Sequence, residues 1–454
     1  MSGKEMDELL FKSIEEIGQL YRKKEVSPYE ITKATIERLN TLEPKLNAFI
    51  TVLSEEALIQ AKKAEDTFVK GVEVGKLYGI PVSLKDIFDT KGIRTSLGSK
   101  IMKDYVPTEN SHVYDAFSKA GAIIVGKNNM LEFAYGSVHP EYGQCNNPWD
   151  INRTAGGSSS GSASSIAAGI GFASIGTDTG GSIRLPSSFC GVVGLKPTYE
   201  TVSRRGLFNL SHSLDHIGPI TRTVRDNAIV LEGISTNQIN YDSVFTESIK
   251  GMKIGVIRSF IDSNTHSEVE ELVASAVEKL TELGGNVVDV KIPGIETFND
   301  IGFPILMSEG SYHHRDWYPK WAEDYAEGTQ IVLKEGFSVS AVTYLEAVEK
   351  KKEFREKLVD LFENFDVLVS PTSPSPATKN DPSFEDTTYD YLQRTMPFNI
   401  SGNPAITVPA GLTPSENLPV GLQFIGRHYD ESTLYRVADA FQLNSGGYRH
   451  PLIY

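Results

Sequence analysis

The arrangement of residues 253–290 constrains the fold of this chain more than any other stretch of the sequence. Residues 253–257 and 287–290 are short and rich in valine and isoleucine, as is typical of β-strands. Between them, apolar residues recur at helical spacing and stop before Gly284-Gly285, a common end of a helix. These apolar positions are Val269, Leu272, Val273, Ala276, Val277, Leu280 and Leu283. A strand, helix, strand unit builds a parallel or mixed sheet, so the sequence predicts an α/β protein.

Similar elements are expected on both sides of this unit. Helices are predicted over 341–362 and 431–443, and strands at 367–369 and 420–425. Two helices are predicted in the first fifty residues, and Ser27-Pro28-Tyr29-Glu30 is a capping box with proline at the first position of the second helix. No internal repeat or change in composition marks a boundary, so we expect one domain over residues 1–454.

The composition argues against several classes of function. The chain has 44 Lys and Arg against 59 Asp and Glu, and its net charge of −15 opposes non-specific binding to nucleic acid or anionic membranes. Two cysteines are too few for a disulfide framework or a structural zinc site of the Cys/His type. Residues 1–8 lack the pattern of a secretory signal, and no apolar stretch approaches the roughly 20 residues that span a bilayer. We therefore expect a cytoplasmic protein with no metal or other cofactor and no nucleic-acid or membrane partner.

Glycine and serine concentrate in two clusters, at residues 156–162 and 176–184. The first cluster admits three interpretations. A phosphate-binding loop would require a lysine where Ser162 stands. A nucleophile elbow centred on Ser159 would have to follow a strand, but residues 146–150 are typical of a turn. The remaining alternative is a surface loop without a catalytic role.

A third segment, residues 79–86, favours a catalytic role for both clusters. It contains an apolar, strand-like stretch that ends in Lys85. Such a strand should be buried in the sheet, where an ammonium group without a function would be energetically costly. The sequence therefore indicates that Lys85 acts together with the two glycine-rich clusters.

The three segments together resemble the amidase signature family. The resemblance rests on Lys85 after Pro-Val-Ser-Leu, on Ser158 in Gly-Gly-Ser-Ser, and on Ser182 in Asp-Thr-Gly-Gly-Ser-Ile-Arg. Further matching pieces lie at 126–133, 189–191, 194–198, 215–219 and 419–423, so the similarity covers essentially the whole chain. It implies an α/β fold with a central mixed sheet covered by helices on both faces, and a catalytic core over residues 79–198.

The resemblance also implies a Ser-cisSer-Lys triad. Ser182 would be the nucleophile, Ser158 would follow a cis peptide bond and relay the proton, and Lys85 would be the base. Lys85 can act near neutral pH only if its pKa falls well below the usual value of about 10.4, which burial without a carboxylate partner would cause. Asp86 faces the opposite side of the strand and is interpreted as structural.

The glycines before Ser182 predict a turn that stabilises an oxyanion through backbone N–H groups. The implied donors are Thr179, Gly180, Gly181 and Ser182. Asp178 and Arg184 flank this turn and are expected to hold it through a charged pair. No histidine is clearly paired with a carboxylate in a glycine-rich setting, and the apolar neighbours of Cys190 indicate an inert thiol.

Within the family, the sequence favours a stand-alone amidase. The main alternative is the glutaminase subunit of a tRNA-dependent amidotransferase, in which an aspartate soon after a Tyr-Leu pair binds the α-amino group of glutamine. Here Tyr391-Leu392 is followed by Gln393-Arg394, and the Arg-Tyr-Asp-Gly-type insert of those subunits is missing. A second alternative, a silent scaffold of the same fold, is opposed by the complete triad.

The expected substrate is a small, mainly apolar or aromatic amide, with esters and carbamates as further possibilities. Segments rich in aromatic residues and methionine are the candidates for its pocket. They comprise Met130, Ala134 and Tyr135, the cluster at 312–321 and the loop at 384–398. The protein is expected to act as a monomer or homodimer, with this small molecule as its partner.

Overall fold

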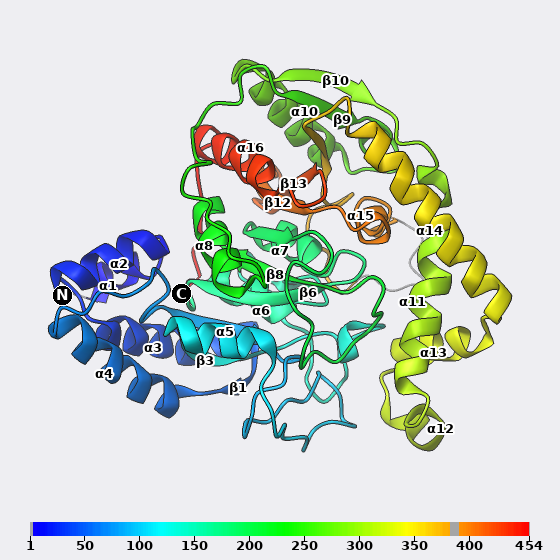
Figure 1. Ribbon diagram of the computed structural model, residues 1–454. Helices are drawn as coiled ribbons and strands as arrows, with labels where there is room; N and C mark the ends of the chain where they lie inside the picture. The colour runs from blue at the N-terminus through cyan, green and yellow to red at the C-terminus, as the bar shows by residue number, and fades with distance from the viewer. Residues whose placement is uncertain (1–2, 382–389, 454) are drawn as a thin grey trace.

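The computed structural model describes residues 3–381 and 390–453. At the centre of the fold is a twisted sheet of 11 strands (Figure 1). The strand order is β1-β3-β2-β6-β8-β7-β12-β13-β11-β9-β10. The strands are β1 (Phe49–Val52), β2 (Pro81–Lys85), β3 (Ile123–Asn128), β6 (Ala173–Asp178), β7 (Val193–Lys196), β8 (His216–Thr221), β9 (Lys253–Ile257), β10 (Asn286–Val290), β11 (Val367–Pro371), β12 (Ala405–Leu412) and β13 (Pro419–Gly426). A separate ribbon pairs β4 (Asn146–Asn147) with β5 (Asp150–Thr154).

Parallel and antiparallel pairs alternate in blocks across the sheet. Strands β3, β2 and β6 are parallel neighbours, and β11, β9 and β10 form a second parallel block. Between the two blocks, β8, β7, β12 and β13 are joined by antiparallel pairs. The predicted mixed sheet is therefore present.

Helices cover both faces of this sheet, and a further group lies beside it. The α-helices of the described residues are α1 (Gly3–Leu9), α2 (Ile14–Lys23), α3 (Pro28–Leu46), α4 (Ser54–Val69), α5 (His112–Ala120), α6 (Ser160–Ala167), α7 (Arg184–Cys190), α8 (Val224–Ile234), α9 (Ser259–Asp262), α10 (Ser267–Glu282), α11 (Phe298–His314), α12 (Tyr318–Trp321), α13 (Glu327–Ser338), α14 (Ala341–Leu361), α15 (Met396–Ser401) and α16 (Glu431–Asn444). Adjacent residues of β3 point to opposite faces of the sheet. Ile124 packs in the core cluster that contains residues of α5 and α8, and Ile123 in the cluster that contains residues of α6.

A group of helices from the last third of the chain lies beside the sheet instead of on it. Helix α11 packs against both α13 and α14, and the three helices run along one side of the molecule, opposite α1 to α4 in Figure 1. This placement brings α11 next to the turn that follows β6, where it contributes to the pocket described below.

The predicted local elements are confirmed except at the start of the chain, where three helices, α1 to α3, stand in place of the two that were predicted. Strands β9 and β10 pair in parallel and α10 connects them, as the pattern over 253–290 indicates. The capping box of α3 is formed, because the Ser27 hydroxyl accepts from Glu30 N–H at 3.2 Å and the Glu30 carboxylate accepts from Ser27 N–H at 2.8 Å. Within the described ranges, no helix is long and apolar enough to cross a bilayer.

The sheet order explains how three distant segments meet. Strands β2 and β6 are parallel neighbours, so their carboxyl ends lie at the same edge. Lys85 is the last residue of β2, and the turn 179–182 follows β6. The loop between β5 and α6 brings Ser158 to the same edge.

Candidate active site

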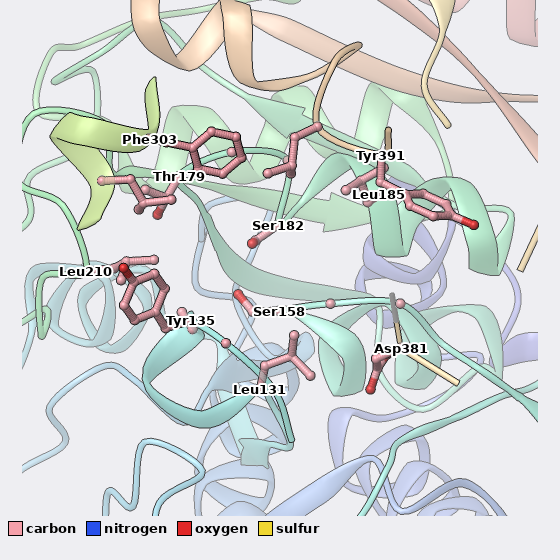
Figure 2. A pocket seen from close by; sticks show the side chains of 18 of the residues that line it. Leu131, Tyr135, Ser158, Thr179, Ser182, Leu185, Leu210, Phe303, Asp381 and Tyr391 are labelled. Atoms are coloured by element: carbon pink, nitrogen blue, oxygen red, sulfur yellow. The ribbon is translucent and has the colours of Figure 1, made fainter. Parts of the chain in front are cut away.

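A cavity of about 460 Å³ opens at this edge of the sheet. Its floor is polar and carries Ser158 and Ser182, whose hydroxyl groups face each other in Figure 2. Its walls are mainly apolar. The lining residues outside the serines and glycines are Leu131, Ala134, Tyr135, Thr179, Leu185, Phe189, Leu210, Asn299, Phe303, Leu306, Asp381, Asp390, Tyr391 and Leu392.

Lys85 is fully buried beneath this floor and faces two hydroxyl groups. Its Nζ donates to Ser158 Oγ and to Thr177 Oγ1, both at 2.7 Å. No carboxylate of the described chain forms an ion pair with it. Burial lowers the pKa of Lys85 to about 7, while the charges of Asp178 and Asp215 oppose this shift. At neutral pH a large fraction of Lys85 is therefore neutral and able to accept a proton.

The backbone around the two serines is fixed by close contacts between their loops. The peptide bond between Gly157 and Ser158 is cis, as the resemblance implies. Ser159 N–H donates to the carbonyl of Ser182 at 3.1 Å, which ties the loop of Ser158 to the turn of Ser182. Both serines therefore belong to one rigid unit with Lys85.

The turn after β6 is held by a buried ion pair. Arg184 donates to both carboxylate oxygens of Asp178 at 2.9 Å, and both side chains are fully buried. Burial alone would raise the pKa of Asp178, but the Arg184 guanidinium holds it well below its usual value. Asp178 also accepts from the N–H groups of Ile183 and Arg184, so it caps the first turn of α7. The expected charged pair is therefore formed beside the turn; its supporting role stays a prediction.

The N–H groups of residues 179–182 donate to no acceptor in the part of the chain that the structure describes. Gly181 has a φ of +141°, and a Cβ at this position would lie 2.5 Å from Thr395 Oγ1. Only glycine fits this close approach. The predicted donors therefore line the cavity with their amides unused, a geometry suited to an oxyanion.

Asp86 lies on the other side of β2 from the cavity and has a separate partner. It pairs with the buried Lys127 at 3.1 Å and accepts from Ser96 N–H at 2.8 Å. The structural interpretation of Asp86 agrees with these contacts. The sequence argument did not single out Lys127, although this lysine also follows an apolar, strand-like stretch at 123–126, which was the available signal.

The sequence also missed two polar residues of the site. Thr177 is the second hydroxyl partner of Lys85, and Asp215 accepts from the Thr179 hydroxyl at 2.7 Å. Asp215 belongs to the matching piece at 215–219, which was the available signal. Nothing in the local sequence placed it against the turn after β6.

The predicted substrate residues lie in different places. Ala134 and Tyr135 line the cavity. Met130 is fully buried and does not line it, whereas the next residue, Leu131, does. The cluster at 312–321 does not line the cavity; the preceding turns of α11 do, through residues such as Phe303. In the loop at 384–398, residues 384–389 lie outside the described residues. Tyr391 and Leu392 contribute to the wall.

Two carboxylates join this apolar wall. Asp381 and Asp390 line the cavity, and no lysine or arginine of the described ranges does so. Figure 2 shows Asp381 on the side of the cavity away from Tyr135. Asp381 accepts from the Thr154 hydroxyl, and burial raises its pKa to about 6.

Other residues with possible catalytic chemistry are engaged in packing. His216 is buried, and burial lowers its pKa well below the usual range while Nδ1 contacts the carbonyl of Leu214 at 2.6 Å. Burial raises the pKa of Cys190 and leaves its thiol protonated. Within the described residues there is no group of three His, Cys, Asp or Glu side chains that could hold a metal.

Comparison with known proteins gives one consistent family. The family model described as Amidase matches residues 30–435. The A subunit of the Glutamyl-tRNA(Gln) amidotransferase of Geobacillus thermodenitrificans is 39% identical over 95% of this chain and 96% of its own length. The structure of the corresponding subunit from Thermotoga maritima has a TM-score of 0.82 and 34% identity, covering 98% of each chain. The peptide amidase of Stenotrophomonas maltophilia has a TM-score of 0.87 and 26% identity over 97% of this chain and 98% of its own.

These relatives contradict two predictions. The preference for a stand-alone amidase of small apolar amides is wrong, and so is the expectation of a monomer or homodimer with no partner beyond a small molecule. Curated relatives at 35–39% identity, covering nearly the whole chain, carry the name of one subunit of an amidotransferase that acts on glutamyl-tRNA.

One part of the wrong prediction was the lack of an aspartate soon after Tyr391-Leu392 to bind an amino group, since Gln393-Arg394 follows instead. Arg394 is buried, donates to the carbonyl of Phe260 at 3.0 Å and to Thr265 Oγ1 at 2.8 Å, and does not line the cavity. The carboxylates that do line the cavity come from Asp381 and Asp390.

Proposed function

Since this chain belongs to the amidase family, we propose that it hydrolyses the side-chain amide of glutamine as the glutaminase component of an amidotransferase that acts on glutamyl-tRNA. The observation that carries this proposal is the 39% identity with such a subunit over nearly the full length of both chains. Hydrolysis of a carbon–nitrogen bond is common to the family. The choice of glutamine and of an assembly with further subunits rests on these relatives.

The proposed reaction begins with proton transfer away from Ser182. Neutral Lys85 accepts the proton of Ser158 across their 2.7 Å contact, and Ser158 accepts the proton of Ser182. The oxygen of Ser182 then forms a bond to the amide carbon of the substrate. The electron pair of the carbonyl moves to its oxygen, which accepts hydrogen bonds from the N–H groups of the turn 179–182.

The tetrahedral intermediate collapses by breaking the carbon–nitrogen bond. The proton held by Lys85 returns through Ser158 to the leaving nitrogen, so ammonia departs and an ester on Ser182 remains. Water then attacks this ester with the same proton relay, and glutamate and free Ser182 are released. The cycle consumes one water and needs no other reactant.

The acidic side of the cavity supports a substrate with a positive charge near its amide. We assign Asp381 and Asp390 as the groups that face the α-ammonium of glutamine, since carboxylates stabilise a cation in a partly buried cavity. The apolar wall opposite, with Tyr135 and Phe303, would exclude water from the ester intermediate.

The proposal is tested by assaying ammonia release from glutamine by the chain combined with the remaining subunits of the amidotransferase. Wild type should release ammonia, and Ser182→Ala should lose this activity while its thermal unfolding is unchanged. Ser164→Ala is a matched control, because Ser164 is a buried serine of the neighbouring α6 whose hydroxyl donates to the carbonyl of Asn146.

Two outcomes would refute different parts of the proposal. Unchanged ammonia release in Ser182→Ala would refute its role as nucleophile. An active serine, shown by a fluorophosphonate adduct on Ser182, together with no hydrolysis of glutamine in the assembled enzyme, would refute glutamine as the substrate.

A further inference from the structure

A buried carboxylate next to the oxyanion turn has no role in the steps proposed above. Asp215 precedes β8 and is 2% exposed. Its Oδ1 accepts hydrogen bonds from the Thr179 hydroxyl at 2.7 Å and from Ser211 N–H at 3.0 Å, and its Oδ2 accepts from Leu210 N–H at 3.0 Å. Asp215 therefore connects the turn after β6 to the loop that carries Leu210, a residue of the cavity wall.

The charge of Asp215 is not balanced by a direct partner. Two carboxylates act on Lys85, and they differ in this respect. Asp178 is neutralised by its ion pair with Arg184, whereas the hydrogen-bond donors to Asp215 are neutral and no ion pair with it forms in the described ranges. The other charged groups that act on Asp215 are Arg204 and Glu309.

We propose that Asp215 is a positioning residue for the hydrolysis. By holding the Thr179 hydroxyl, it fixes the first residue of the oxyanion turn against the loop of Leu210, so that turn and wall keep one geometry. The inference rests on the proposed function, because it assigns a role within the same reaction.

A second contact layer anchors this connection to the helices beside the sheet. The Ser211 hydroxyl donates to Glu309 of α11 at 2.6 Å, and the Tyr344 hydroxyl of α14 donates to the same carboxylate at 2.9 Å. Ser213 N–H also donates to Glu309 at 2.9 Å. The loop is thus held from two sides, by Asp215 toward the turn and by Glu309 toward the helices.

The charge of Asp215 also gives the positioning role a distinct readout. Its negative charge favours the ammonium form of Lys85. Burial raises the pKa of Asp215 itself to about 7, so this charge acts on Lys85 only where Asp215 is ionised, near and above that pH. Asp215→Asn removes the charge there, so the pKa of Lys85 should fall and the upper part of the acid limb of the pH–rate profile should move to lower pH. Glu309→Gln is the control. It removes a buried carboxylate of the same network, but Glu309 is not among the charges that act on Lys85, so the acid limb of this variant should stay in place.

The experiment measures the rate at which a fluorophosphonate modifies Ser182 as pH is varied, which requires no knowledge of the amide substrate. Asp215→Asn and Thr179→Val should each slow modification by on the order of 10- to 100-fold, the typical effect of a misplaced catalytic group. Thr179→Ser keeps the hydroxyl and should restore most of the rate. Thermal unfolding of each variant shows whether it is folded, and Thr179→Val probes the same hydrogen bond if Asp215→Asn does not fold.

Wild-type rates and an unshifted acid limb in Asp215→Asn would overturn the inference. Equal losses in Thr179→Ser and Thr179→Val would also overturn it, because they would show that the hydroxyl contact is irrelevant. A third outcome separates the two proposals. If labelling of Ser182 depends on Asp215 as described but the protein does not hydrolyse glutamine, the positioning role is supported and only the proposed substrate is refuted.

Discussion

Replacing Arg184 with methionine should be among the most damaging single changes in this protein. Arg184 is fully buried and binds both oxygens of Asp178. Without it, the Asp178 charge remains buried, which typically costs about 3–5 kcal/mol. The carbonyl of Thr395 and the side-chain oxygen of Gln423 also lose their guanidinium donors, at roughly 1–3 kcal/mol for each group that stays unsatisfied. A loss of this size is a large fraction of the roughly 5–15 kcal/mol that stabilises a folded protein.

The pH dependence identifies the buried charge as the cause. In wild type the pKa of Asp178 lies below its usual 3.8, so the ion pair stabilises the fold above pH 3.8 and this contribution is lost as pH falls toward the folded pKa. In Arg184→Met burial raises that pKa instead, so the penalty is present at neutral pH and shrinks as acid protonates Asp178. The double variant Arg184→Met/Asp178→Asn should recover part of the stability at neutral pH.

Urea unfolding followed by tryptophan fluorescence measures these differences, with wild type, both single variants and the double variant compared at neutral and mildly acidic pH. The reasoning is refuted if the double variant is destabilised by the sum of the two single changes, since no coupling would then exist between the side chains. A destabilisation of Arg184→Met below about 1 kcal/mol would refute the assigned magnitude.

Three further predictions concern activity. Wild-type hydrolysis should rise as pH increases through about 7, where Lys85 loses its proton, and Lys85→Met should remain inactive at every pH; recovery at alkaline pH would point to another base. Gly181→Ala should lower kcat by about 100-fold or more, because its Cβ would meet Thr395 Oγ1 at 2.5 Å and displace the oxyanion turn; a normal kcat in a steady-state assay would contradict this. Asp381→Asn should raise KM for glutamine about fivefold with little change in kcat. This corresponds to the loss of a partly exposed charge pair between Asp381 and the substrate ammonium, worth roughly 1 kcal/mol. An unchanged KM would show that Asp381 does not bind the ammonium group.

The candidate site could be proposed from the sequence because its residues lie on short segments with strong local constraints. Lys85 ends an apolar strand, and the glycines before Ser182 serve a turn that a larger residue could not form. Both features follow from burial and backbone sterics, which act on near neighbours. The functional context was predicted wrongly, because two local features were given more weight than the similarity of the whole chain: the residues after Tyr391-Leu392 and the missing Arg-Tyr-Asp-Gly-type insert.

The sequence by itself determined the secondary structure that depends on local patterns, such as the capped start of α3 at Ser27 and the unit from β9 to β10. Only the tertiary structure decided which distant groups meet. Thr177 reaches Lys85 across 92 positions, Asp215 reaches Thr179 across 36, and Phe303 of α11 completes the cavity wall. Caps and periodicity reflect interactions within a few residues, whereas these contacts arise from the order of strands in the sheet and from helices that pack beside it, which no local pattern encodes.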